Sequence, residues 1–334
     1  MALHTWLQFS PETAIRSIRS KFREAVHSVI NRKGAVVAVS GGIDSSVCAA
    51  LSVNAFGKDR VFALMLPERD SSPSCREMGE ILCRHLGIRY EVQDIASTLE
   101  SIGCYRRRDE AIRSVIPGYT HEWKSKIVIS QNLFEADRIN FFKLVVESPS
   151  GERSEKRLPL DAYLQVVAAT NFKQRIRKTI EYFHADRLHY AVVGTPNRLE
   201  FDQGFFVKNG DGAADVKPIA HLYKSQVYEL ARYLGIPAAI VEAEPTTDTY
   251  SLRQGQDEFY FVLPYRKMDI ILYGLNNGKS VEEVARETGL TLEQVGRVFR
   301  DIRIKRRTTS SLHLSAILLG EIPEIHRGNR EFGP

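Results

Sequence analysis

The chain has 334 residues, of which 43% are hydrophobic and 26% are charged. This is the composition of an ordinary globular protein, so it excludes a disordered chain, and the absence of a repeat at fixed period argues against a solenoid or propeller. The formal net charge of +5 is too small for this length to require a nucleic-acid partner.

The N-terminal part alternates between helical and strand patterns. Ser10 and Pro11 are suited to begin a helix whose apolar positions recur up to Ile30, and the continuous apolar run at 35–39 is typical of a strand buried on both faces. The next predicted elements are a helix at 46–56, a strand at 60–66, a helix at 74–86 and a strand at 89–95. Strands that alternate with helices predict βαβ units and a parallel sheet.

The alternation then breaks. Strand patterns occur at 126–130 and 140–147, and Ser148-Pro149-Ser150-Gly151 is a strong turn signal before another strand-like run at 157–160. We therefore expect an insertion at about 104–163 that carries a β-hairpin on an otherwise α/β core.

The second half returns to the first pattern. Its predicted elements are a helix from about 164, a strand at 189–193, a helix at 223–234 closed by Gly235 and Pro237, and mostly helix beyond Pro264. The predicted fold is a doubly wound parallel α/β sheet over residues 1–262, with a helical region at 263–334 packed on it.

Membrane and metal signals are weak in this sequence. No segment has the roughly 20 apolar residues that span a membrane, and the N-terminus lacks a secretory signal pattern, so we expect a cytoplasmic protein without a membrane partner. The four cysteines form no C-x-x-C pair, and a structural zinc site is therefore not expected.

The most informative segment is Ser40-Gly41-Gly42-Ile43-Asp44-Ser45-Ser46, which lies between the apolar run and the next helix. Glycines let a backbone approach a ligand closely, and the N–H groups of such a turn and of the helix N-terminus bind anions. Asp44 repels a phosphate unless a cation lies between them, so it suits a magnesium ligand. The alternative is an ordinary glycine turn with a capping serine.

This S-G-G-x-D-S segment resembles the pyrophosphate loop of the N-type ATP pyrophosphatases, which have an adenine nucleotide alpha hydrolase-like fold and activate substrates as adenylates. The second half resembles one family within that group, the ammonia-dependent NAD synthetases. The matching segments are Gly194-Thr195, Glu200, residues 204–215, Pro218, Leu222-Tyr223-Lys224, residues 171–175 and Glu244-Pro245-Thr246. The resemblance covers about residues 15–310 apart from the insertion.

The resemblance implies a role for each matched residue. The implied ATP-binding residues are Ser40, Gly41, Gly42, Asp44, Ser45, Ser46, Thr195, Lys224 and Thr246, of which Asp44 and Lys224 would be catalytic. Asp44 and Glu200 would hold Mg²⁺. The implied binding residues for nicotinic acid adenine dinucleotide are Arg175, Lys208, Asp215 and Lys305, whose cations suit a carboxylate and a pyrophosphate. Blander alternatives are a solvated helix-face pair for Glu200 and Lys208, and an exposed charge run at 305–307.

The implied reaction is the ATP-driven amidation of nicotinic acid adenine dinucleotide to NAD through an acyl-adenylate, with release of AMP and pyrophosphate. The nitrogen donor is expected to be ammonia, free or from a separate glutaminase, because the loop begins at Ser40 and leaves no room upstream for a glutaminase domain. The family also implies a homodimer.

Three features depart from the family pattern, all on the side of the acyl acceptor. They are Tyr260 and Phe261-Val262 within 257–262, Ile304 in place of a histidine, and the insertion, which we expect to shape the acceptor pocket or the dimer wall behind it. The main alternative is therefore a diverged amide ligase that adenylates another carboxylate. A tRNA-modifying pyrophosphatase is disfavoured by the cysteine spacing. A DNA-binding helix-turn-helix at 280–303 is explained better by helix packing.

Overall fold

The computed structural model describes residues 3–129, 142–243, 250–252, 255, 260–261, 263–320 and 322. Its centre is a parallel sheet of four strands in the order β3-β2-β1-β7. The strands are β1 (Ala35–Ala38), β2 (Val61–Met65), β3 (Arg89–Val92) and β7 (Ala191–Val193). In this register Ala35 lies beside both Val61 and Ala191, so β1 is the inner strand next to β7.

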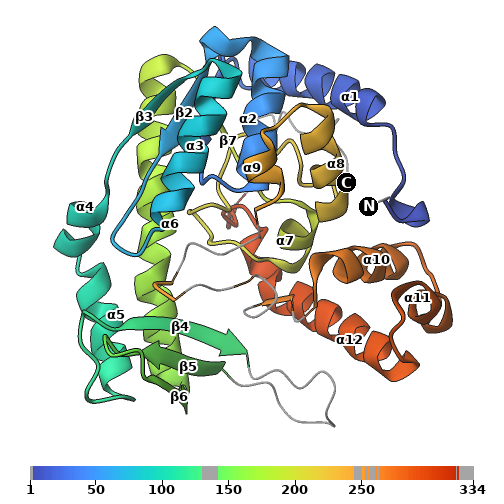
Figure 1. Cartoon of the computed structure of the whole chain (residues 1–334). Coiled ribbons are helices and arrows are strands. Elements are labelled where there is room, and N and C mark those ends of the chain that lie inside the picture. The colour runs from blue at the N-terminus through green and yellow to red at the C-terminus, as the bar shows by residue number, and fades with distance from the viewer. Residues whose placement is uncertain are drawn as a thin grey trace.

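Helices cover both faces of this sheet, as Figure 1 shows. One layer contains α1 (Pro11–Glu24), α2 (Ile43–Phe56), α3 (Pro73–Leu86) and α8 (Lys224–Tyr233). The other contains α4 (Ala96–Ser101), α5 (Cys104–Arg113) and α6 (Leu160–Leu188). Successive side chains of a strand point to opposite faces of the sheet, and β1 shows this. Ala35 and Val37 pack with the first group of helices, while Val36 packs with the second. This confirms the predicted doubly wound fold.

The loop motif changes where one helix begins. Helix α2 begins at Ile43, earlier than the predicted residue 46, because Gly42 has the extended conformation of an N-cap. Asp44, Ser45 and Ser46 therefore belong to the first turn of α2. The predicted first helix is also found, with the Ser10 side chain accepting a hydrogen bond from the Thr13 N–H, and it continues as the π-helix Ala25–Val29.

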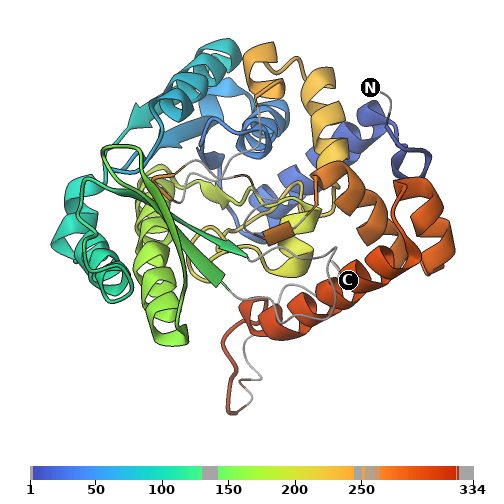
Figure 2. The same cartoon turned by 60° about the horizontal axis from the view of Figure 1, so that its bottom comes forward.

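The insertion forms a second sheet that is larger than the predicted hairpin. The strands β4 (Lys124–Ile129), β5 (Phe142–Glu147) and β6 (Arg153–Arg157) are antiparallel in the order β4-β5-β6. Residues such as Leu144 and Val146 point into a core shared with α5 and α6, whereas β6 is exposed along its length. Figure 2 shows this sheet against α5 and α6, away from α1 and α8.

The region after Pro264 is helical, as predicted. It contains α10 (Tyr265–Asn276), α11 (Val281–Thr288) and α12 (Leu292–Thr309), and a shared apolar cluster also takes in Leu199 of α7 (Arg198–Gln203). Apolar side chains of α11 and α12 are buried against α10, so packing explains the spacing that is similar to a helix-turn-helix. The short elements are α9 (Ala238–Val241), Thr5–Leu7, Lys58–Arg60 and Ser310–Leu312. Within the described ranges, every helix is too short or too polar to cross a membrane.

Candidate active site

The turn between β1 and α2 is held in shape by its own hydroxyl groups. The Ser45 hydroxyl donates to the Gly42 carbonyl at 3.0 Å and accepts from the Ser40 N–H at 3.3 Å, and the Ser46 hydroxyl donates to the same carbonyl at 2.9 Å. Ser46 is fully buried and does not line the cavity beside the turn, whereas Ser40, Gly42 and Ser45 do. Most of the predicted loop therefore faces open space, as an anion site requires.

Gly41 shows why this turn needs glycine. Its φ angle is +80°, and a Cβ at this position would lie 2.5 Å from the Cys75 carbonyl oxygen. A side chain would therefore be strained by its backbone conformation and would collide with the start of α3. The turn packs directly on the first turn of α3.

Asp44 connects this turn to two other elements. One of its carboxylate oxygens pairs with the Lys224 ammonium, and the other accepts a hydrogen bond of 3.3 Å from the Asn197 side-chain amide. Lys224 begins α8 and its side chain is 3% exposed. Burial opposes the charged ammonium, but the carboxylates of Asp44 and Glu200 outweigh that effect and raise the pKa of Lys224.

Glu200 is placed by a capping box at the start of α7. The Asn197 side chain accepts from the Glu200 N–H at 3.3 Å, and the Glu200 carboxylate accepts from the Asn197 N–H at 3.1 Å. Asn197 therefore contacts both carboxylates that the sequence assigns to a metal. It was missed as a site residue, although the N-x-x-E spacing of Asn197 and Glu200 is a recognisable N-cap signal.

A second residue that the sequence analysis missed lies behind Lys224. Asp269 of α10 is fully buried, and its carboxylate accepts hydrogen bonds from the Lys224 N–H at 3.2 Å and the Ser225 N–H at 2.7 Å. Burial raises the Asp269 pKa to about 7, against the lowering effect of these hydrogen bonds. Its only signal in the sequence is an acid between Met268 and Ile270 in an apolar helix.

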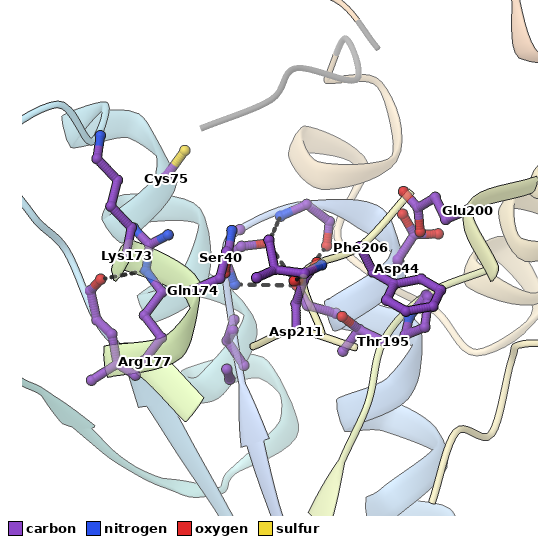
Figure 3. A pocket seen from close by; sticks show the side chains of 18 of the residues that line it. Ser40, Asp44, Cys75, Lys173, Gln174, Arg177, Thr195, Glu200, Phe206 and Asp211 are labelled. Carbon is purple, nitrogen blue, oxygen red and sulfur yellow. Dashed lines mark hydrogen bonds between the residues drawn. The ribbon is translucent and has the colours of Figure 1, made fainter. Parts of the chain in front are cut away.

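Asp44, Glu200 and Lys224 line one cavity of about 710 Å³ at the carboxyl ends of β1, β2 and β7. Figure 3 shows Asp44, Thr195 and Glu200 on one side of it and Lys173 and Arg177 on the other. The cavity wall brings together, from the residues predicted by sequence, Ser40, Gly41, Gly42, Asp44, Ser45, Arg175, Thr195, Glu200, Lys208 and Lys224.

Two of the predicted dinucleotide-binding cations lie together at this wall. The Arg175 guanidinium of α6 donates to the Lys208 carbonyl at 3.3 Å, and the Lys208 ammonium donates to the Ser311 carbonyl at 2.9 Å. Lys208 follows the end of α7 at Gln203, so Glu200 and Lys208 are not a pair on one helix face. Both instead contribute to the cavity.

The other two predicted dinucleotide-binding residues do not line this cavity. Asp215 accepts from the Val192 N–H at 2.7 Å and from the Tyr182 hydroxyl at 3.4 Å, beside β7. The Lys305 ammonium donates to the Tyr260 carbonyl at 2.5 Å and pairs with Asp301 at 2.7 Å, and burial lowers its pKa. Their substrate role stays a prediction, and Thr246 lies outside the described residues.

The departures from the family pattern fall at different distances from the cavity. Tyr260 lines it, donates to the Gln203 carbonyl at 2.6 Å and stacks on Phe205, whereas the Ile304 side chain is exposed. The strands β4, β5 and β6 are not among its described lining residues, and Tyr163 is the point at which the insertion reaches it.

Comparisons with known proteins agree on one relationship. A family model described as NAD synthase matches residues 14–118 and 123–308. The curated NH(3)-dependent NAD(+) synthetase of Rhizobium meliloti (strain 1021) is 56% identical over 296 residues, which cover 89% of this chain and 88% of that protein.

Solved structures show the same fold. NMN synthetase from Francisella tularensis has a TM-score of 0.62 at 22% identity, over 93% of this chain and 99% of that one. The NH3-dependent NAD synthetase of Campylobacter jejuni has a TM-score of 0.60 at 21% identity, over 94% of this chain and all of that one. At such identities the likeness establishes the architecture alone.

Proposed function

The chain belongs to the NAD synthase family, and on that premise we propose how its residues carry the reaction of an ammonia-dependent NAD synthetase. This reaction forms a C–N bond, because ammonia amidates nicotinic acid adenine dinucleotide while ATP is cleaved to AMP and pyrophosphate. The observation that carries the proposal is the meeting of Asp44, Glu200 and Lys224 at the β1–α2 turn, at one end of the cavity.

The turn from Ser40 to Ser45 is the proposed phosphate site. Its backbone N–H groups and the N-terminus of α2 provide the donors and the partial positive charge that phosphate oxygens need. The Lys224 ammonium is held in the same place by Asp44, and it is charged because neighbouring carboxylates raise its pKa. In this proposal it moves toward the phosphates when ATP binds, and Thr195 provides a further polar contact.

Asp44 and Glu200 are the proposed magnesium ligands. The described residues contain no group of three or more His, Cys, Asp or Glu side chains able to hold a metal. Two carboxylates oriented by one asparagine nevertheless fit Mg²⁺, which commonly takes one or two protein carboxylates and completes its shell with phosphates and water. When bound, the ion would neutralise charge on the phosphates.

The chemistry then needs positioning more than a protein nucleophile. A carboxylate oxygen of the dinucleotide attacks the α-phosphorus of ATP, the bond to the bridging oxygen breaks, and pyrophosphate leaves with that electron pair. Lys224 stabilises the charge that develops on pyrophosphate. Ammonia then attacks the acyl carbon of the adenylate, loses a proton, and displaces AMP. Arg175 and Lys208 are the proposed cations that hold the dinucleotide in line.

Three further expectations remain proposals. We expect a homodimer with the acceptor pocket shared between subunits, a separate glutaminase as one source of ammonia in the cell, and a cytoplasmic location. Asp215 and Lys305 do not line the cavity. In this proposal they contact the dinucleotide where it extends past the cavity wall, or after the protein rearranges on binding it.

Product analysis tests the proposal. The purified protein is mixed with ATP, Mg²⁺ and nicotinic acid adenine dinucleotide, with either ammonium or glutamine. We expect equal amounts of NAD, AMP and pyrophosphate with ammonium, and none with glutamine alone. Turnover driven by glutamine would contradict the ammonia-dependent assignment. Pyrophosphate release with ammonium but without the dinucleotide would mean that ATP cleavage does not depend on the dinucleotide carboxylate, which would contradict the proposal.

A further inference from the structure

A buried cluster of charges lies on the opposite side of the cavity from Asp44. It joins the loop after β2 to α5 of the insertion and to α6. The Asp70 carboxylate accepts from the Arg108 guanidinium at 2.5 Å and from the Lys173 ammonium at 2.7 Å, and Lys173 also pairs with Glu68 at 2.9 Å. The side chains of these four residues are at most 6% exposed.

Further contacts tie the same three segments together. The Tyr105 hydroxyl of α5 donates to Glu68 at 2.8 Å and accepts from the Arg69 N–H at 3.3 Å, and the Arg69 guanidinium lies 3.9 Å from the centre of the Tyr105 ring. Arg108 also pairs with Asp109 at 2.9 Å. Three acids (Glu68, Asp70 and Asp109) thus meet three bases (Arg69, Arg108 and Lys173), so the cluster is balanced within the protein.

The loop that carries Glu68 and Asp70 is also a wall of the nucleotide cavity. Pro67 and Ser71 of this loop line the cavity. So does Cys75 in the first turn of α3, which directly follows the loop and whose carbonyl packs against Gly41 of the phosphate turn. Lys173 is itself a lining residue, as Figure 3 shows. A shift of this loop would therefore be transmitted to the turn that holds the phosphates.

We propose that Asp70 is a positioning residue for ATP. It acts through Arg108 and Lys173 to fix the loop at 67–72, and with it the first turn of α3, against the phosphate turn. The inserted helix α5 then serves the nucleotide site without lining it, because its Arg108 supplies one of the three cations paired with Asp70. This inference rests on the proposed function only in taking ATP as the ligand. Burial opposes ionisation of Asp70, but Lys173 and Arg108 outweigh it and lower the Asp70 pKa to about 2.

The role of Asp70, on the loop after β2, is tested by calorimetric titration with ATP. Calorimetry measures ATP binding without the amidation reaction. Asp70→Asn keeps the shape of the side chain and removes its charge. We expect about 10-fold weaker binding of ATP and unchanged binding of nicotinic acid adenine dinucleotide, since only the loop against the phosphate turn is released. A merely structural role would loosen both sites, so equal weakening for the two ligands, or unchanged ATP affinity, would overturn the proposal.

The role of Arg108, on α5 of the insertion, is tested with a matched pair of variants on that helix. Arg108→Gln removes the buried cation, whereas Arg106→Gln removes an exposed one that pairs with Glu110. We expect weaker ATP binding for Arg108→Gln alone. The double variant Asp70→Asn, Arg108→Gln should bind ATP no more weakly than the worse single variant, because the two groups act as one unit. Additive losses would show that Arg108 does not act through Asp70.

If the Asp70→Asn and Arg108→Gln variants do not fold, a milder substitution at Arg108 still tests the proposal. Arg108→Lys keeps the charge and loses the planar fork, so we expect a folded protein with about threefold weaker ATP binding. Equal ATP affinity for this variant and the unchanged protein would contradict the proposal. A protein that binds ATP as described but makes no NAD would refute the proposed function and leave this inference standing.

Discussion

Two charged clusters lie on opposite sides of one cavity, and they differ in how their charges are balanced. Asp44, Glu200 and Lys224 are two acids and one base, and all three line the cavity. The cluster around Asp70 has three acids and three bases, most of them buried, and only Lys173 among them lines the cavity.

This difference indicates what each cluster is for. An excess carboxylate at the proposed phosphate turn leaves a negative charge for a cation to balance, which fits our proposal that ligands complete the first cluster. In a balanced buried network each charge is paired within the protein. Removing one member leaves its partner buried without a counter-charge, and this destabilises the fold by more than the intact network stabilises it. Substitutions in the first cluster should therefore lower the rate of the reaction, whereas substitutions in the second should lower stability and ATP affinity.

The largest effect is expected at Asp44. Asp44→Asn removes a carboxylate from the proposed metal site, which should lower kcat by about 10³-fold or more while the fold stays intact. Steady-state rates at saturating Mg²⁺ measure this. Asp161→Asn is the matched control, because Asp161 also lies in the first turn of a helix but is exposed. A variant at Asp44 that keeps most of its rate would contradict the metal role.

A smaller effect is expected at Lys224. Lys224→Met keeps much of the side-chain volume and removes the charge that we propose stabilises departing pyrophosphate, so kcat should fall by about 10²- to 10³-fold. The kcat/KM for ammonium should not change, because ammonia enters only after pyrophosphate has left. Rapid-quench measurement of pyrophosphate release separates the two steps. An unchanged first step would remove Lys224 from the chemistry.

The Asp70 cluster should be visible in the pH dependence of stability. The Asp70 pKa is lowered from 3.8 to about 2 in the folded protein, so its ionised form stabilises the fold above the unfolded value and this contribution is lost as pH falls from about 4 to 2. The shift corresponds to about 2 kcal/mol. Urea unfolding at several pH values should show that Asp70→Asn is less stable at pH 6 and that the gap narrows below pH 4. A gap independent of pH would mean that the carboxylate charge contributes nothing.

The smallest effect on the nucleotide site is expected at the hairpin tip. Shortening the segment between Glu147 and Lys156 should leave the ATP KM unchanged, because no described residue of β5 or β6 lines the cavity. We predict a change instead in the dinucleotide KM or in dimerisation, which kinetics and sedimentation measure. A folded, dimeric protein with both KM values unchanged would leave the hairpin without a role in the site.

The features that could be predicted from the sequence are those that depend on a local pattern of residues. The apolar run of β1, the alternating helices and the glycine turn at Gly41 were all recoverable, because each follows from periodicity or from backbone conformation over a few residues. The second sheet was recovered in part. The turn at 148–151 indicated the hairpin of β5 and β6, whereas no turn signal of that kind indicated that β4 pairs with β5.

Long-range pairs account for what was missed. Asp70 meets Arg108 and Lys173 from other elements, and Asp269 reaches the backbone of Lys224 from α10. No spacing rule links such residues, because only the tertiary fold brings them together. Conversely, the family pattern named Asp215 and Lys305, whose side chains here contact β7 and Tyr260 instead of the cavity.

The central claim is that the dinucleotide carboxylate attacks the α-phosphorus of ATP at the turn beside Asp44. Isotope transfer tests it directly. Nicotinic acid adenine dinucleotide labelled with ¹⁸O in its carboxylate is converted with ATP, Mg²⁺ and ammonium, and the products are analysed by mass spectrometry. The account predicts one ¹⁸O atom in AMP and none in pyrophosphate, because the attacking oxygen stays on the α-phosphorus when ammonia displaces AMP. Label in pyrophosphate, or unlabelled AMP, would contradict it.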